Sequence, residues 1–209
     1  MAIIHHTTMT PTKLELLTTW LPGRPWYRGA GSAPELARTG GFRLDDPAGE
    51  VGMEFMVVSD GATAYHVPLT YRGAPLAGAE HTLVGTSEHG VLGTRWIYDG
   101  THDPLLVRQL VALLAGETEA QAQSVSDTPD PTVTVDRADP GLSTAGLTVG
   151  AVTDGAEATD IDLGPGPLTL RVHRVLTPAT AATRPLAQVT APWQPPTATQ
   201  PRALFATLR

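Results

Sequence analysis

Residues 36–71 read LARTGGFRLDDPAGEVGMEFMVVSDGATAYHVPLTY, and this stretch decides the fold. Its three mostly apolar runs, at 36–44, 50–58 and 62–71, are separated by the short polar sequences DDPAG and SDG. Runs of this length joined by Gly, Pro and Asp turns are typical of β-hairpins. The stretch therefore predicts an antiparallel meander that forms the core of the first half of the chain.

Two amphipathic helices are expected on either side of this meander. The first spans residues 11–21 and follows Thr10, which we expect to be its N-cap. The second spans residues 104–116 and follows Asp103, a residue type that caps helix N-termini. Both segments repeat apolar residues at helical spacing, so each predicts a helix with one buried face.

The rest of the chain contains short strand patterns. We expect a strand at 2–9, another at Arg95–Tyr98, and in the last third only strands, at 132–137, 147–152, 168–176 and 203–209. The Ser-, Asp- and Pro-rich segment 124–131 is the predicted linker between a domain at 1–123 and a smaller β-rich unit at 132–209. The expected fold class is α+β: a curved antiparallel sheet with two packed helices, followed by the β-rich unit.

The composition excludes several classes of function. The chain has 209 residues, a formal net charge of −7 and no cysteine, so disulfides and thiol nucleophiles are ruled out. Nucleic acids and anionic membranes bind clustered Lys and Arg, and we expect neither as a partner. The N-terminus lacks a signal-peptide pattern, and no run approaches the roughly 18 apolar residues of a membrane span. A cytoplasmic protein is expected.

Three segments carry a resemblance to a known family. They read TTWLPGRPWYRG at 18–29, YHVPLTYRGAPL at 65–76 and GTSEHGVLGTRWIYDGTHDP at 85–104. Over roughly residues 10–115 the chain resembles the N-terminal cap domain of actinobacterial maltokinases. It looks more closely like stand-alone actinobacterial proteins that carry this cap without a kinase. The resemblance implies an accessory protein that works with a separately encoded protein partner, in α-glucan or trehalose metabolism.

The kinase reaction itself is not expected. In maltokinases the cap lies on a kinase that phosphorylates maltose with ATP. Such phosphoryl transfer needs an Asp and an Asn in the catalytic loop and usually a Lys that pairs with phosphate. The chain contains no Asn, its single lysine, Lys13, falls in the first predicted helix, and no phosphate-binding glycine motif occurs. We expect no cofactor, and the sequence favours a non-enzyme without excluding another kind of enzyme.

The segment 88–104 is the most polar candidate site. Its imidazoles and carboxylates are ligand types that suit zinc, iron or manganese, but the spacing contains no helical ligand pair, so no metal is expected. One interpretation is a structural junction, in which Asp103 caps the following helix, Asp99 forms a turn and Trp96 belongs to the core. The alternative is a surface that binds a sugar or another small molecule.

Aromatic faces and hydrogen-bonding groups would form such a surface. The segment 24–29 adds an aromatic pair between two arginines, and one of its aromatic residues is also expected to pack the end of the first helix against the sheet. The candidate binding residues are Trp26, Tyr27, Arg28, Glu88, His89, Arg95, Trp96, Asp99 and His102. No catalytic residue is predicted.

Overall fold

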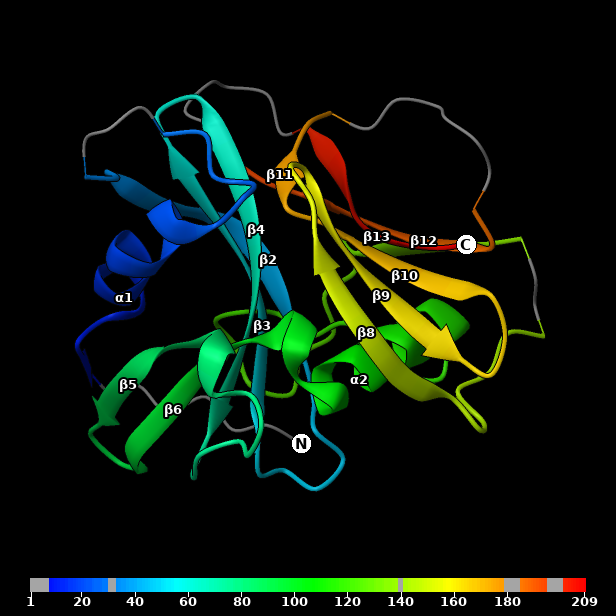
Figure 1. The fold of residues 1–209 in the computed structure, drawn as a ribbon, viewed down its shortest axis with the longest axis horizontal. Coiled ribbons are helices and arrows are strands. Elements are labelled where there is room, and N and C mark those ends of the chain that lie inside the picture. The colour runs from blue at the N-terminus through cyan, green and yellow to red at the C-terminus, as the bar shows by residue number, and fades with distance from the viewer. Residues whose placement is uncertain (1–7, 30–32, 139–140, 179–184, 195–200) are drawn as a thin grey trace.

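Two antiparallel sheets and two short α-helices form the computed structural model, which describes residues 8–29, 33–138, 141–178, 185–194 and 201–209 (Figure 1). Seven strands form the first sheet: β1 (Met9–Thr10), β2 (Leu36–Leu44), β3 (Gly52–Asp60), β4 (Thr63–Arg72), β5 (Leu83–His89), β6 (Gly93–Asp99) and β11 (Val175–Leu176). Six strands form the second: β7 (Thr134–Arg137), β8 (Thr148–Asp154), β9 (Ala158–Gly164), β10 (Leu168–His173), β12 (Ala187–Pro192) and β13 (Arg202–Leu208).

The predicted meander is confirmed as β2, β3 and β4, which pair antiparallel in chain order. The first sheet then continues from β4 through β6 and β5 to β1, while β11 also pairs with β4. The second sheet has the order β7-β12-β13-β10-β9-β8. The fold is therefore mostly β, and the α+β prediction holds only in the coarse sense that two helices pack on antiparallel sheets.

The two faces of the first sheet have different partners. Helix α1 (Lys13–Trp20) covers one face, and helix α2 (Pro104–Ala115) lies with the second sheet on the other face (Figure 1). Strand β3 supplies both cores, because successive side chains of a strand point to opposite faces. Phe55 and Val57 belong to the core shared with the second sheet, whereas Met56 and Val58 pack beneath α1.

Both predicted helices are present, and one of the two expected N-caps is wrong. Helix α1 is capped by Thr12, not Thr10, because Thr12 and Glu15 form a reciprocal capping box with a Glu15 N to Thr12 Oγ1 distance of 3.3 Å. Helix α2 is capped as predicted by Asp103, whose carboxylate accepts a hydrogen bond from Leu105 N at 3.0 Å.

Three strands were missed in the sequence. Strand β5 (LVGTSEH) has no regular alternation, and β9 (ATDIDLG) and β12 (AQVTAP) each contain only one or two large apolar residues, so their apolar patterns are weaker than those of the meander. Glu88 and His89 end strand β5, which pairs with β6. Most of the strand expected at 2–9 lies outside the described residues, and its end coincides with β1.

The two sheets share a hydrophobic core. The rings of Phe42 on β2 and Phe205 on β13 lie 5.7 Å apart, and buried residues of α2 belong to the same cluster. The segment between α2 and β7 folds back on itself, since Ala122 N donates to Thr128 O and Asp130 N donates to Ala120 O. The division into a domain at 1–123, a linker at 124–131 and a unit at 132–209 stays a prediction.

Candidate functional site

The two halves of the chain meet along one edge of β4, in a gap between the two strands that pair with this edge. Strands β6 and β11 both pair with this edge: Asp99 lies opposite Leu69, and Val175 lies opposite Tyr65. The β4 residues between these two pairs therefore face neither strand. Asp99 at the end of β6 and Arg174 just before β11 meet across this gap, where the backbone N–H of His66 donates to Arg174 O at 2.8 Å.

Arg174 occupies the gap and is fully buried. Its Nη2 donates to both carboxylate oxygens of Asp99, at 2.8 and 2.6 Å, and to Thr101 Oγ1 at 2.7 Å. Its Nε donates to Thr159 Oγ1 at 2.7 Å, and its guanidinium lies 4.9 Å from the ring centroid of Trp26. Among the described residues, Nη1 has no hydrogen-bond partner. The residue thus connects the first sheet, the aromatic segment 24–29 and strand β9.

The buried charges at this junction shift the pKa values of neighbouring side chains. Burial raises the pKa of Asp99, but the Arg174 guanidinium outweighs burial and holds that pKa below its usual value. Burial, followed by the charge of Arg174, lowers the pKa of His66 to about 3. His66 is therefore neutral at neutral pH, and its Nδ1–H donates to the His173 carbonyl, with 2.9 Å between the two atoms. The site is a paired, desolvated ionic junction.

Residues 26–28 form the aromatic wall of this junction. The Trp26 ring is fully buried, 5.9 Å from the ring of Trp20 and 6.0 Å from that of Tyr65. Tyr27 lies 5.4 Å from Tyr65 and donates its hydroxyl to Asp60 at 2.6 Å. The prediction that one of these aromatic residues packs the helix end against the sheet is confirmed by Trp26. The side chain of Arg28 is exposed.

The β5–β6 hairpin holds three other predicted residues, well away from Arg174 along the strands. Glu88 accepts a hydrogen bond from Thr94 Oγ1 at 2.7 Å, and Arg95 Nη2 donates to Leu92 O at 2.5 Å. His89 Nδ1 accepts from the backbone N–H of Leu92 at 3.1 Å. These contacts stabilise the turn of the hairpin, whose side chains Val91 and Leu92 are 62% and 44% exposed.

The expectation that Trp96 belongs to the core is not met. Its side chain is half-buried and belongs to neither hydrophobic cluster, while its strand neighbour Ile97 is 1% exposed. Ile97 faces α1, and alternation along β6 turns Trp96 to the opposite face, which α2 does not cover at this point. The aromatic character of residues 95–98 could not show which of the two faces is buried.

Six of the predicted binding residues thus lie in three separate places. Trp26 and Asp99 both contact Arg174, whereas Glu88, His89 and Arg95 stabilise the hairpin. His102 lies against His81, with ring centroids 5.5 Å apart. Arg174 was not predicted as a site residue. The only signal in the sequence is its place in the largely apolar run 168–176, since charged side chains are rarely buried unless they are paired.

A second buried ionic cluster lies beneath α1. Glu54 on β3 is 4% exposed and accepts hydrogen bonds from Lys13 Nζ at 2.5 Å, Tyr71 Oη at 2.7 Å and Gln123 Nε2 at 3.1 Å. Burial raises the pKa of Glu54, but the charge and hydrogen bond of Lys13, the hydrogen bond from Tyr71 and the charge of Arg38 together keep that pKa below its usual value. The single lysine of the chain is thus engaged in an ion pair with the sheet.

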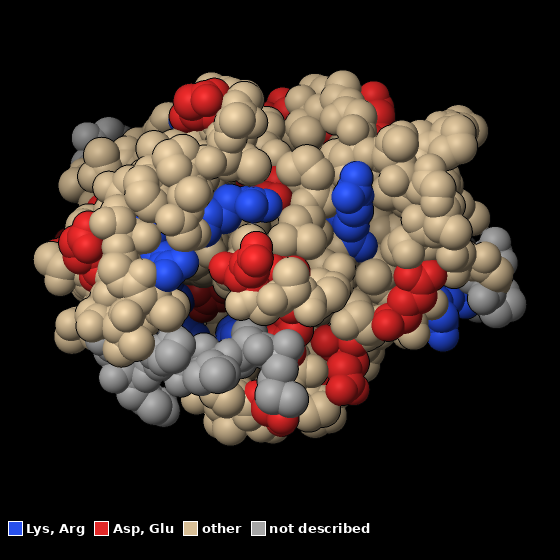
Figure 2. Space-filling view, turned by 90° about the horizontal axis from the view of Figure 1, so that it is seen from below, with Lys and Arg blue, Asp and Glu red and all other residues tan. Residues whose placement is uncertain are grey.

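Charges on the surface are mixed. On the face shown in Figure 2, acidic and basic side chains lie interspersed rather than gathered into one basic stripe. Among the described residues, no group of three or more His, Cys, Asp or Glu side chains is arranged to hold a metal ion. No helix in the described part of the chain is both long and apolar enough to cross a membrane.

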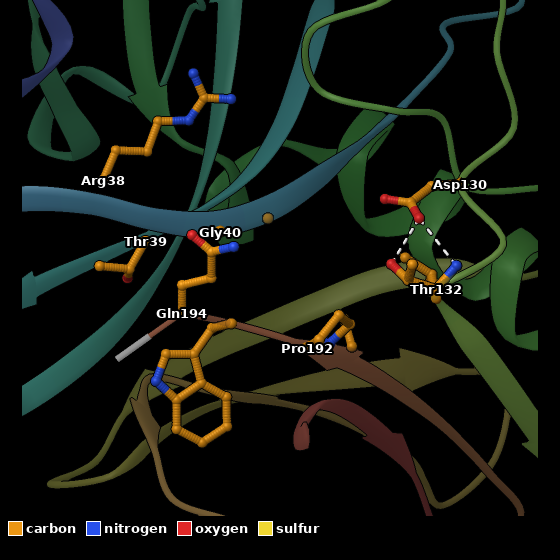
Figure 3. Close-up of a pocket in the computed structure, with 11 residues that line it drawn as sticks. Arg38, Thr39, Gly40, Asp130, Thr132, Pro192 and Gln194 are labelled. Carbon is orange, nitrogen blue, oxygen red and sulfur yellow. Dashed lines mark hydrogen bonds between the residues drawn. The ribbon is translucent and has the colours of Figure 1, made fainter. Parts of the chain in front are cut away.

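A small hollow lies where β2 meets the end of β12. Its volume is about 290 Å³, and Figure 3 shows Asp130 and Thr132 on one side of it and Gln194 on the other. Asp130 Oδ1 accepts hydrogen bonds from Thr132 N and Oγ1, at 2.9 and 2.6 Å. Thr39 Oγ1, also in the lining, has no hydrogen-bond partner among the described residues. None of the predicted binding residues lines this hollow.

The segment between the end of α1 and the N-cap of α2 contributes most of the first sheet, together with Trp26 and Asp99 of the junction. The family model of the maltokinase N-terminal cap domain matches residues 20–103, which run from the last residue of α1 to the N-cap of α2. The predicted resemblance is confirmed for this region, which is less than half of the 209-residue chain. No curated protein matches the chain.

Proposed function

We propose that the chain is a non-catalytic accessory protein of the cytoplasm. In this proposal, its cap-like domain docks on a separately encoded protein of α-glucan or trehalose metabolism. The match of residues 20–103 to the maltokinase cap supports the link to this metabolism. The non-catalytic role rests on one observation: internal contacts occupy the carboxylates of the segment 88–104.

The carboxylates of that segment illustrate the point. Asp99 pairs with Arg174, and Asp103 accepts two hydrogen bonds from Arg72, at 2.7 and 2.8 Å, while it caps α2. Glu88 accepts from Thr94 within the hairpin. A general acid or base must be free to reach a substrate proton, whereas these groups hold strands and a helix in place.

The turn of the β5–β6 hairpin is the proposed docking element. Val91 and Leu92 are the most exposed large apolar side chains of the cap-like region, and they project from a hairpin braced by Glu88 and Arg95. Exposed apolar side chains on a rigid support are suited to a partner's apolar pocket, because little conformational entropy is lost on binding.

Copurification from a lysate of the organism that encodes the chain tests this function. We expect the tagged chain to recover one protein in stoichiometric amount, and Val91→Asp/Leu92→Asp to lose it, because a charge would enter an apolar contact. Val125→Asp is the matched control, since Val125 is 55% exposed but lies outside the cap-like region. Equal recovery by all three proteins would contradict docking through the hairpin.

A sugar-binding module is the second candidate, and the hollow beside β2 favours it. The sequence placed such a site in the Glu88–His102 region, but Thr39, Asp130 and Gln194 offer a hydroxyl, a carboxylate and an amide around one space. These are the groups that bind sugar hydroxyls. Under this candidate a panel of sugars should raise the melting temperature of the chain but not of Gln194→Ala. Under the first candidate the panel gives no shift.

A further inference from the structure

Two histidines far apart in the sequence meet at the base of the β5–β6 hairpin. His81 lies in the 3-10 turn η2 (Glu80–Thr82) just before β5, and His102 lies in the 3-10 turn η3 (Gly100–His102) just after β6. Because Leu83 pairs with Tyr98, the residues before β5 and after β6 lie at the same end of the hairpin. The two imidazole centroids are 5.5 Å apart, with an angle of 83° between the ring planes.

Neither imidazole is committed to another described residue by a hydrogen bond or an ion pair. The other described histidines have such partners: His66 is bound to the His173 carbonyl, His89 accepts hydrogen bonds within the hairpin turn, and His173 Nε2 lies 3.4 Å from Thr207 Oγ1. His81 is exposed and His102 is half-buried. Ring nitrogens of both residues are therefore available to a ligand from solvent.

The separation of the rings suits one shared metal ion. Imidazole nitrogen binds zinc at about 2.0–2.1 Å, so two imidazoles on one tetrahedral ion have ring centroids roughly 5 Å apart. The observed centroid separation of 5.5 Å is close to this value. Imidazole is also a preferred ligand of copper and nickel.

The surrounding charges favour a cation. Asp99 and Asp154 both act on His102 electrostatically, and Arg174, the cation that also faces it, is paired with Asp99. Asp154 additionally accepts a hydrogen bond from Thr159 Oγ1 at 2.5 Å, which fixes the position of its carboxylate.

We propose that His81 and His102 form a two-histidine site for a divalent transition-metal ion of the zinc, copper and nickel group. Since the described residues provide no group of three ligands, water or a ligand from solvent completes the coordination. The site lies at the opposite end of the hairpin from Val91 and Leu92 and does not depend on the proposed docking function.

Zinc titration of the 209-residue chain by calorimetry tests the site. The parent protein for this test carries His5→Ala and His6→Ala, because these adjacent histidines are themselves potential metal ligands. We expect one zinc ion per chain, and binding at least about tenfold weaker in His81→Ala and in His102→Ala. His89→Ala is the matched control and should bind like the parent. Since His81 is exposed, His81→Ala keeps the test valid if His102→Ala does not fold.

Copper provides a second measurement. Cu²⁺ bound to the parent should show an electron paramagnetic resonance spectrum with hyperfine splitting from two imidazole nitrogens, and His81→Ala should lose one of them. No zinc binding by the parent, or zinc binding in both single variants that is as strong as in the parent, would overturn the proposal. If the copurification experiment recovered no partner, the expected zinc binding would be unchanged. The docking proposal and the metal-site proposal can therefore fail independently.

Discussion

Among single residues, Arg174 has the largest expected effect on stability. Its guanidinium is fully buried and forms an ion pair with Asp99 at 2.6 Å. Arg174→Met would leave the Asp99 carboxylate buried without a cation, and removing one partner of a buried pair typically costs about 3–5 kcal/mol. We expect urea unfolding to show a decrease of this size in the free energy of unfolding.

A double variant separates the lost charge from the lost packing. Asp99→Asn/Arg174→Met leaves no unpaired charge, so it should recover a large part of the stability that Arg174→Met loses. The idea that this pair holds the junction would be wrong if Arg174→Met cost less than about 0.5 kcal/mol, the range of ordinary surface substitutions.

His66 makes the stability depend on pH. Its folded pKa is about 3, against an ordinary value of 6.5. Between these values the unfolded chain binds a proton that the folded chain does not, so the free energy of unfolding falls as the pH decreases. One such group contributes about 1.4 kcal/mol per pH unit. His173, whose pKa burial lowers to about 4, adds to the same slope.

His66→Leu removes one of these two contributions. Urea unfolding at several pH values from 6.5 down to 4.5 should therefore show a shallower decrease for His66→Leu than for the parent, whatever the absolute stability of the variant. Parallel slopes for the parent and His66→Leu would show that His66 does not set the acid sensitivity.

Among the elements, α1 depends on its capping box. The helix has only eight residues, too few to be stable without its cap and its packing. Thr12→Ala removes the side-chain acceptor for Glu15 N, and loss of such a cap costs about 0.5–2 kcal/mol. Thermal unfolding should show this loss, whereas Thr19→Ala, at an exposed position of the same helix, should change little.

The helices and strands also show which parts of the fold could be predicted from the sequence. The meander and both helices were predictable because their apolar spacing and end residues act locally: Asp103 caps α2, and Gly116, with a φ of 72°, ends it. Thr10 and Thr12 could both cap a helix, and only the capping box with Glu15 decided between them. Strand β5 was missed because its sequence has no apolar alternation, and pairing with β6 forms it.

For the whole molecule we expect no sugar phosphorylation. The chain has no Asn for a catalytic loop, and Lys13 is engaged by Glu54. A radiolabel transfer assay with ATP and maltose, trehalose, glucose or glucosamine should give no labelled product. Reproducible sugar phosphate that disappears on substitution of a residue in 85–104 would contradict this expectation and favour an enzyme.

The sequence by itself determined the local features: the turns of the meander, the helix ends, the absent phosphate-transfer groups and the resemblance to the cap over its central segments. Only the tertiary structure decided which distant residues meet. Asp99 and Arg174 are 75 residues apart and become neighbours because β6 and β11 align on the same edge of β4. His81 and His102 meet because the register of β5 and β6 returns the chain to the same end of the hairpin. Local residue patterns carry no information on such strand alignment, which depends on how the sheets pack around their shared core.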